Sequence, residues 1–116
     1  MEDCIFCKIA KGELPSTKYY EDDFVICIKP LGEIVQGHTL LIPKKHSENI
    51  FDITKEDLEK VVGVARELAL KFKNEGATGI NLLHASGKDA EQSVFHFHMH
   101  LIPRHTGDNL KLHSNF

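Results

Sequence analysis

The chain has 116 residues, which is the length of one domain, and we expect a single domain over residues 1–116. Lys and Arg total 14 against 17 Asp and Glu, for a formal net charge of -3 at pH 7. This balance lacks the basic field that binding to nucleic acid requires, although a single nucleotide could still be a ligand.

The chain begins Met-Glu-Asp-Cys, without the basic and apolar segments of a secretory signal, and no apolar run reaches the length of a membrane span. We therefore expect a cytoplasmic protein that does not bind membranes. In a reducing compartment, the Cys-x-x-Cys of Cys4 and Cys7 favours a metal or redox motif over a structural disulfide. Cys27 lies in an apolar run and is interpreted as a core residue.

The first half of the chain predicts one short helix and three strands. Residues 4–10 are typical of a short helix, which Gly12 and Pro15 soon end. Residues 19–21 and 24–28 predict two strands joined by a tight hairpin. A third strand follows over residues 38–43, with His38 as its first residue.

The longest predicted element is a helix that starts after Thr54. Thr54 followed by Asp57 is a variant of the capping box, and Gly76 marks the C-terminal stop. Apolar residues at three- and four-residue spacing predict the face of this helix that packs on the core. They are Leu58, Val61, Val62, Ala65, Leu68, Ala69 and Phe72.

Two more strands complete the predicted order, at residues 79–83 and at residues 93–102, with a glycine-containing loop at 85–91 between them and Pro103 ending the second strand. This order predicts an α+β domain in which a mostly antiparallel sheet carries the long helix on one face. The start of the third strand and the last strand could then be neighbours.

The most unusual feature of the sequence is His-Phe-His-Met-His at residues 96–100. Alternate residues of a β-strand face opposite sides, so His96, His98 and His100 share one face. The outer two Cα atoms would be about 13 Å apart. This is too far for three imidazoles to bind one metal ion at about 2.0–2.1 Å. We therefore expect His96 to belong to one site and His98 and His100 to another.

One group of candidate residues has the chemistry of a metal site. His46 and His96 would complete a Cys₂His₂ set with Cys4 and Cys7, and zinc in structural sites prefers four such ligands. The alternative is a reduced pair of thiols without a metal.

A second group consists of His98, His100 and His38, with Gln92 and Ser93 just upstream of the triplet. Imidazole is both a good nucleophile and a good leaving group at phosphorus, so it can divide a displacement into two steps. Ser, Gln and backbone N–H groups could bind the phosphoryl oxygens. The sequence has neither a glycine-rich phosphate loop nor a carboxylate cluster for magnesium, so histidine is the best candidate for chemistry at phosphate.

Residues 92–102 contain the pattern His-φ-His-φ-His-φ-φ and resemble the histidine triad (HIT) superfamily. The resemblance extends to residues 4–9 and 37–46. Within the superfamily, the chain is most similar to the branch of nucleoside phosphoramidases and related bacterial proteins. It implies a HIT-like α+β fold with a five-stranded sheet, one long helix and one short helix. It also implies a homodimer with a continuous larger sheet, and hydrolysis or transfer at the α-phosphate of nucleotides such as AMP or GMP conjugates.

The resemblance also implies roles by position. His98 would be the nucleophile that forms a nucleotidyl-histidine intermediate, and His100 and His38 would support it. Ser93 and Gln92 would lie beside the phosphate or the leaving group. The base pocket of the family falls on residues that could equally be ordinary core: Ile5, Phe6, Ile9, Ile28 and Leu31. Family members with Cys-x-x-Cys hold a structural zinc ion, and no organic cofactor, at the positions of Cys4, Cys7, His46 and His96.

The sequence departs from the family pattern at three positions. The acidic ribose-binding position is Pro30, with Glu33 nearby, an amide position on the phosphate side is Ala85, and a usual glycine is Glu91. These departures permit a second function, a purine-nucleotide-binding regulatory module with little turnover. Two further alternatives are a dinucleoside polyphosphate hydrolase and a metallohydrolase with zinc on His98 and His100.

Overall fold

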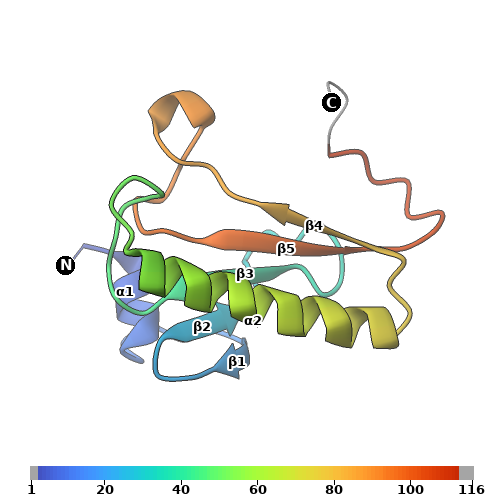
Figure 1. Cartoon of the computed structure of the whole chain (residues 1–116), viewed down its shortest axis with the longest axis horizontal. Helices are drawn as coiled ribbons and strands as arrows, with labels where there is room; N and C mark the ends of the chain where they lie inside the picture. Colours follow the sequence, from blue (N-terminus) through green and yellow to red (C-terminus); the bar gives the residue numbers. More distant parts are fainter. Residues whose placement is uncertain (1–2, 113–116) are drawn as a thin grey trace.

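The computed structural model describes residues 3–112 (Figure 1). Its elements are α1 (Ile5–Ala10), β1 (Lys18–Glu21), β2 (Val25–Ile28), β3 (Thr39–Pro43), α2 (Lys55–Asn74), β4 (Gly79–Leu83), a 3-10 turn η1 (Lys88–Ala90) and β5 (Met99–Arg104). No helix in this part of the chain is long and apolar enough to cross a membrane.

The five strands form one sheet in the order β1-β2-β3-β5-β4, and every neighbouring pair is antiparallel. This confirms the predicted α+β class and the hairpin of β1 and β2. Strand β5 comes last in the chain but lies between β3 and β4, so that His100 pairs with Leu40 on one side and with Leu83 on the other. The sheet therefore places the end of the histidine triplet on an interior strand.

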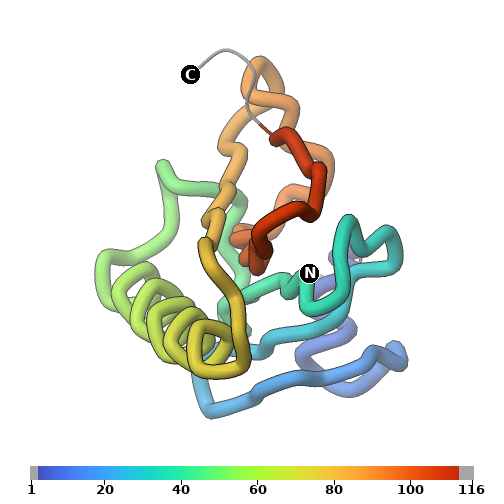
Figure 2. Tube along the Cα trace, turned by 90° about the vertical axis from the view of Figure 1, so that its right-hand side faces the viewer, coloured from blue at the N-terminus to red at the C-terminus, as the bar shows by residue number. Residues whose placement is uncertain are grey.

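Alternate side chains of the strands divide the core into two layers. The long helix α2 covers one face, and the buried cluster there is formed by Val25, Cys27, Leu41, Val61, Ala65, Phe97 and Leu101. The short helix α1 covers the other face, where the buried cluster is formed by Phe6, Ile9, Ile26, Ile28, Leu40 and Ile42. Figure 2 shows the two helices on opposite sides of the sheet. Because His100 pairs with Leu40, it lies on the α1 face.

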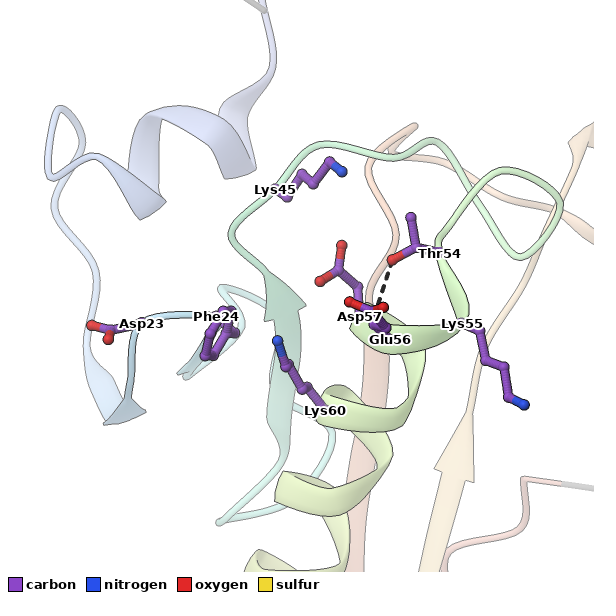
Figure 3. A pocket seen from close by; sticks show the side chains of 8 residues that line it. All are labelled: Asp23, Phe24, Lys45, Thr54, Lys55, Glu56, Asp57 and Lys60. Atoms are coloured by element: carbon purple, nitrogen blue, oxygen red, sulfur yellow. Dashed lines mark hydrogen bonds between the residues drawn. The ribbon is translucent and has the colours of Figure 1, made fainter.

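Both ends of α2 follow the predicted signals. The Thr54 hydroxyl accepts a hydrogen bond from the Asp57 backbone N–H at 3.1 Å, drawn as a dashed line in Figure 3. After the helix, Gly76 has a φ of 108°, the left-handed conformation that favours glycine. The predicted core face is wrong at Val62, which is 45% exposed, whereas the neighbouring Val61 is fully buried. One helical residue turns the side chain by about 100°, away from the sheet.

The predicted strand over residues 93–102 is also wrong in its bounds. Strand β5 starts at Met99, because β3 pairs with it only from Met99 and β4 only from His100. Phe97 instead donates its backbone N–H to the Ser47 carbonyl at 2.8 Å. At the other end, Pro103 lies inside the strand. Pairing with β3 stops at Leu101, so Pro103 has a strand neighbour on one side alone and its missing N–H is tolerated.

Helix α1 has only six residues, too few for an isolated helix to be stable. The Cys4 side chain caps its first turn by accepting a hydrogen bond from the Cys7 backbone N–H at 3.3 Å. Phe6 and Ile9 are buried against the sheet. The position of α1 therefore depends on contacts with the sheet rather than on helix propensity.

Candidate functional site

The structure brings together the three predicted catalytic histidines on the α1 face. His38 precedes β3, His98 precedes β5, and His100 lies within β5. The Nε2 atom of His38 lies 2.9 Å from Nδ1 of His100, and the ring centroids of His98 and His100 are 5.4 Å apart. His38 is almost fully buried. The three rings thus form one contiguous group.

The main chain reaches His38 through Gly37, which has a φ of 92°. A Cβ atom at this position would lie 3.0 Å from side-chain atoms of both Phe72 and Pro103. Glycine is therefore required here both for the backbone conformation and for the close approach to α2 and β5.

Hydrogen bonds to the main chain determine where the protons of His38 and His100 lie. The backbone N–H of Ile34 donates to Nδ1 of His38 at 3.1 Å, so this nitrogen carries no proton. The proton of neutral His38 is then on Nε2, which donates to Nδ1 of His100. Neutral His100 consequently carries its own proton on Nε2 and can donate it to a ligand.

The opposite arrangement holds for His98. Its Nδ1 atom lies 2.8 Å from the carbonyl oxygen of His96, and a carbonyl can only accept. Nδ1 of His98 is therefore protonated, and the lone pair of the neutral ring is on Nε2. A nucleophile needs such a lone pair, so the hydrogen bonds distinguish His98 from its neighbour His100.

Burial keeps this group of imidazoles neutral at pH 7. Burial, together with the nearby His98 and His38, lowers the pKa of His100 to about 4. Burial also lowers the pKa of His38 below its usual value, against a small opposing effect of Glu33. The pKa of His98 is lowered by burial as well.

The two residues predicted beside the phosphate have different surroundings. Ser93 is exposed, and its hydroxyl makes no hydrogen bond within residues 3–112. The amide nitrogen of Gln92 donates to the carbonyls of Glu48 and Val94, at 2.6 and 3.0 Å, and its amide oxygen accepts from the Gly87 backbone N–H at 2.8 Å. Gln92 therefore holds two loops together with its side chain, while Ser93 is available to a ligand.

The predicted base-pocket residues do not all meet. Phe6, Ile9 and Ile28 are buried in the cluster beneath α1, and the Phe6 ring contacts the edge of the His98 ring with centroids 5.1 Å apart. Ile5 is 43% exposed, and Leu31, in the loop after β2, is fully exposed. The structure therefore brings Phe6 to the triad and leaves Leu31 in solvent.

A surface hollow of about 440 Å³ lies at the start of α2 (Figure 3). Lys60 projects across it, with Nζ 3.3 Å from the centroid of the Phe24 ring. No histidine lines this hollow. It is separate from the triad and contributes nothing to chemistry there.

Cys4, Cys7, His46 and His96 each offer one donor atom, and these four atoms all lie within 4.8 Å of one another. Nδ1 of His96 is 3.2 Å from Sγ of Cys4 and 3.2 Å from Nδ1 of His46, which is 3.4 Å from Sγ of Cys7. Bonds of about 2.3 Å to sulfur and 2.0–2.1 Å to nitrogen in a tetrahedron separate the donors by about 3.3–3.8 Å. The four residues therefore fit a tetrahedral metal ion.

The surroundings of His96 favour the same use. Its Nε2 atom donates to the Pro43 carbonyl at 2.7 Å, so the lone pair of the neutral ring is on Nδ1, toward the other donors. Burial is the main reason that the pKa of His96 is lowered, and this keeps the ring neutral as a ligand must be. As expected from strand geometry, His96 lies in a different group from His98 and His100.

His84, which follows β4, belongs to none of the motifs in the sequence. Its Nδ1 atom lies 2.9 Å from the carbonyl oxygen of His98, and its ring stacks on Phe97 with centroids 4.3 Å apart. A lone histidine after a strand has no recognisable pattern. The signal in the sequence that could have indicated its role is that His84 directly follows the predicted strand at residues 79–83, which precedes the strand with the histidine triplet.

Comparison with known proteins gives the family. The HIT domain model matches residues 11–107. Protein hit of Bacillus subtilis is 43% identical over 105 residues, which cover 90% of this chain and 72% of that protein. The crystal structure of a Zn-bound histidine triad family protein from Mycobacterium smegmatis has a TM-score of 0.89 and 34% identity, covering 96% of this chain and 81% of that one. Adenylylsulfatase HINT3 of Arabidopsis thaliana is 38% identical over 112 residues, 93% of this chain and 55% of that protein.

The chain therefore belongs to the HIT domain family. This confirms the resemblance seen in residues 92–102 and the expected five-stranded fold with two helices. The zinc of the Mycobacterium protein and the activity in the name of the Arabidopsis protein are properties of those relatives.

The lowered pKa values of His100 and His38 predict a pH-dependent stability. Between about pH 6.5, the usual pKa of an unfolded histidine, and about pH 4, the unfolded chain binds protons that the folded chain does not. The free energy of unfolding should therefore fall as the pH falls through this window. The free energies of urea unfolding of wild type and of His100→Asn, compared at several pH values, isolate the contribution of the His100 imidazole. Wild type should lose more stability than the variant, by at most about 1.4 kcal/mol per pH unit. Equal slopes would contradict the neutral, buried state of His100.

Proposed function

We propose that the protein is a nucleotide hydrolase or transferase that acts at the α-phosphate of nucleoside phosphoramidates or related conjugates through a nucleotidyl-His98 intermediate. The observation that carries this proposal is the Nε2 lone pair of His98, set by the hydrogen bond from Nδ1 to the His96 carbonyl. The relative named as an adenylylsulfatase supports a substrate with an adenylyl group.

In the proposed first step, Nε2 of His98 forms a bond to the α-phosphorus as the bond from phosphorus to the leaving nitrogen breaks. The Nε2–H of neutral His100 donates a hydrogen bond to the leaving nitrogen, which takes up a proton from water as it departs, and His38 holds His100 in the correct tautomer. In the second step, water attacks phosphorus, the bond to His98 breaks, and the attacking water releases to solvent a proton that balances the one taken up in the first step. The net reaction consumes one water and releases a nucleoside monophosphate and an amine.

The proposed substrate contacts follow from exposure and position. The free hydroxyl of Ser93 would bind a phosphoryl oxygen, and Gln92 would shape the phosphate side by holding its two loops. The base would pack near Phe6 and against the residues assigned with it by resemblance: Ile5, Ile9, Ile28 and Leu31.

A regulatory module that binds nucleotides with little turnover is the second candidate. Glu91 favours it, because its φ of 67° is left-handed and strained for a residue with a side chain, at a position where the family usually has glycine. Pro30 and Ala85 also remove the polar groups expected for ribose and phosphate. Turnover of adenosine 5′-phosphoramidate by the purified protein separates the two functions.

The central prediction is a covalent adduct on His98. With adenosine 5′-phosphoramidate, rapid quench followed by intact-mass analysis should show one AMP added to wild type and none added to His98→Asn. Loss of the nucleophile should lower turnover by about 10⁴ or more, because no other group replaces the attacking lone pair. His100→Asn is the matched control and should slow formation of the adduct without preventing it. Near-normal turnover in His98→Asn together with none in His100→Asn would reverse the assigned roles.

We also propose that Cys4, Cys7, His46 and His96 hold a structural zinc ion. The donor set, its spacing and the second hydrogen bond of His96 support this identity. Zinc would join the short helix α1 to the end of β3 and to the segment before β5. Because α1 is too short to be stable alone, its position would depend on the ion.

Protein purified without chelator should contain zinc near one ion per chain by elemental analysis. The Cys4→Ser/Cys7→Ser double variant should lose the metal and melt at a lower temperature, whereas Cys27→Ala, outside the site, should keep the metal. Chelation should lower the melting temperature of wild type but not that of the double variant. Metal-free wild type, or a double variant that retains zinc, would refute the site.

We further propose a homodimer that joins two sheets along β4 into one larger sheet. Strands β1 and β4 are the two edges of the described sheet. The β1 edge carries Lys18 and Glu21 and has an irregular register, both of which protect an edge from pairing. Strand β4 carries no charge, and Leu82 within it is 45% exposed. The β4 edge is therefore the one suited to a partner copy.

Light scattering should give a dimeric mass for wild type at micromolar concentration. Leu82→Lys should shift the protein toward a monomer, because a charge would be buried at the β4 interface. Tyr20→Lys places the same charge on the β1 edge and should leave the dimer intact. A monomeric wild type, or equal effects of the two variants, would contradict pairing along β4.

A further inference from the structure

His98 lies where the sheet no longer supports its main chain. Pairing between β4 and β5 ends at Leu83 and His100, and β5 itself begins at Met99. The carbonyl group of His98 is therefore beyond the backbone ladder. The side chain of His84 takes the place of a strand N–H by donating from Nδ1 to this carbonyl at 2.9 Å.

A chain of hydrogen bonds fixes the direction of this donation. The backbone N–H of Ile50 donates to the Ser86 hydroxyl oxygen at 2.9 Å, and the hydroxyl is hydrogen-bonded to Nε2 of His84. One end of the chain is an N–H that can only donate, and the other end is the His98 carbonyl, which can only accept. The Ser86 hydroxyl therefore donates to Nε2, and the proton of neutral His84 is on Nδ1.

The imidazole of His84 is also held by packing. Its ring is stacked on Phe97 at an interplanar angle of 28°, and Phe97 is fully buried in the cluster beneath α2. The donor thus rests on a rigid part of the core, on the side of the sheet opposite the triad.

From these contacts we infer that His84 is a positioning residue, which orients the nucleophile by holding the carbonyl of His98. This inference rests on the proposed function. His98 is held at two points, at its ring by the His96 carbonyl and at its own carbonyl by His84. Without His84, the peptide after His98 can rotate, and the direction of the Nε2 lone pair changes with it.

The test uses three variants of His84 in the full chain with adenosine 5′-phosphoramidate. His84→Phe keeps a ring on Phe97 but removes the donor, whereas His84→Asn keeps an N–H close to the position of Nδ1. The rate of adenylylation in a single turnover should fall roughly 10- to 100-fold in His84→Phe, since a small displacement of a reacting group has effects of this size. KM should stay within about twofold. His84→Asn should recover much of the rate, and His84→Ala should resemble His84→Phe.

A second readout does not require activity. Nitrogen NMR of the His98 ring should show one tautomer, with Nδ1 protonated, in wild type and in His84→Asn, and a mixture in His84→Phe. Wild-type adenylylation and a single tautomer in His84→Phe would overturn the inference. So would a loss of rate in His84→Asn as large as that in His84→Phe. A wild-type protein with no turnover would refute the proposed function, while the tautomers would still test the role of His84.

Discussion

Much of the site depends on His96, because its ring belongs to one group of residues and its backbone carbonyl to another. Its ring lies among Cys4, Cys7 and His46, while its carbonyl oxygen accepts the Nδ1 proton of His98. The side chain is fully buried and is held from behind by the Pro43 carbonyl. Contacts that fix the ring of His96 therefore also help to fix its carbonyl, and this carbonyl selects the tautomer of His98.

His38, His84, His96 and His98 share a physical feature, which is that each ring has a hydrogen bond to a main-chain group. The Ile34 N–H starts the chain through His38 to His100, and the His98 carbonyl ends the chain from Ile50 through His84. Main-chain donors and acceptors cannot exchange roles. The tautomers therefore follow from the fold itself. This matters because His98 could not attack phosphorus without its lone pair on Nε2, and His100 could not donate to the leaving nitrogen without its proton on Nε2.

Local signals in the sequence predicted the elements well, and tertiary pairing decided what they missed. The cap at Thr54 and the stop at Gly76 act within one helical turn, so they could be read directly. The start of β5 depends on where β3 and β4 stop pairing, which no local pattern contains. The same holds for His84, whose partner is 14 residues away in the chain. The alternation of side chains continues before Met99, since His96 contacts Phe6 of α1 whereas Phe97 is buried beneath α2. The spacing along this alternation therefore still separated His96 from His100.

Gly37 brings the backbone before β3 close to α2 and to β5. With no side chain, it lets the backbone that carries His38 lie directly against Phe72 of α2 and Pro103 of β5. The last turns of the long helix and the buried imidazole are thus in mechanical contact through a single peptide unit. A side chain at residue 37 would have to displace Phe72 or Pro103, so a substitution there would disturb the backbone that carries His38 and the packing of α2 on the sheet together.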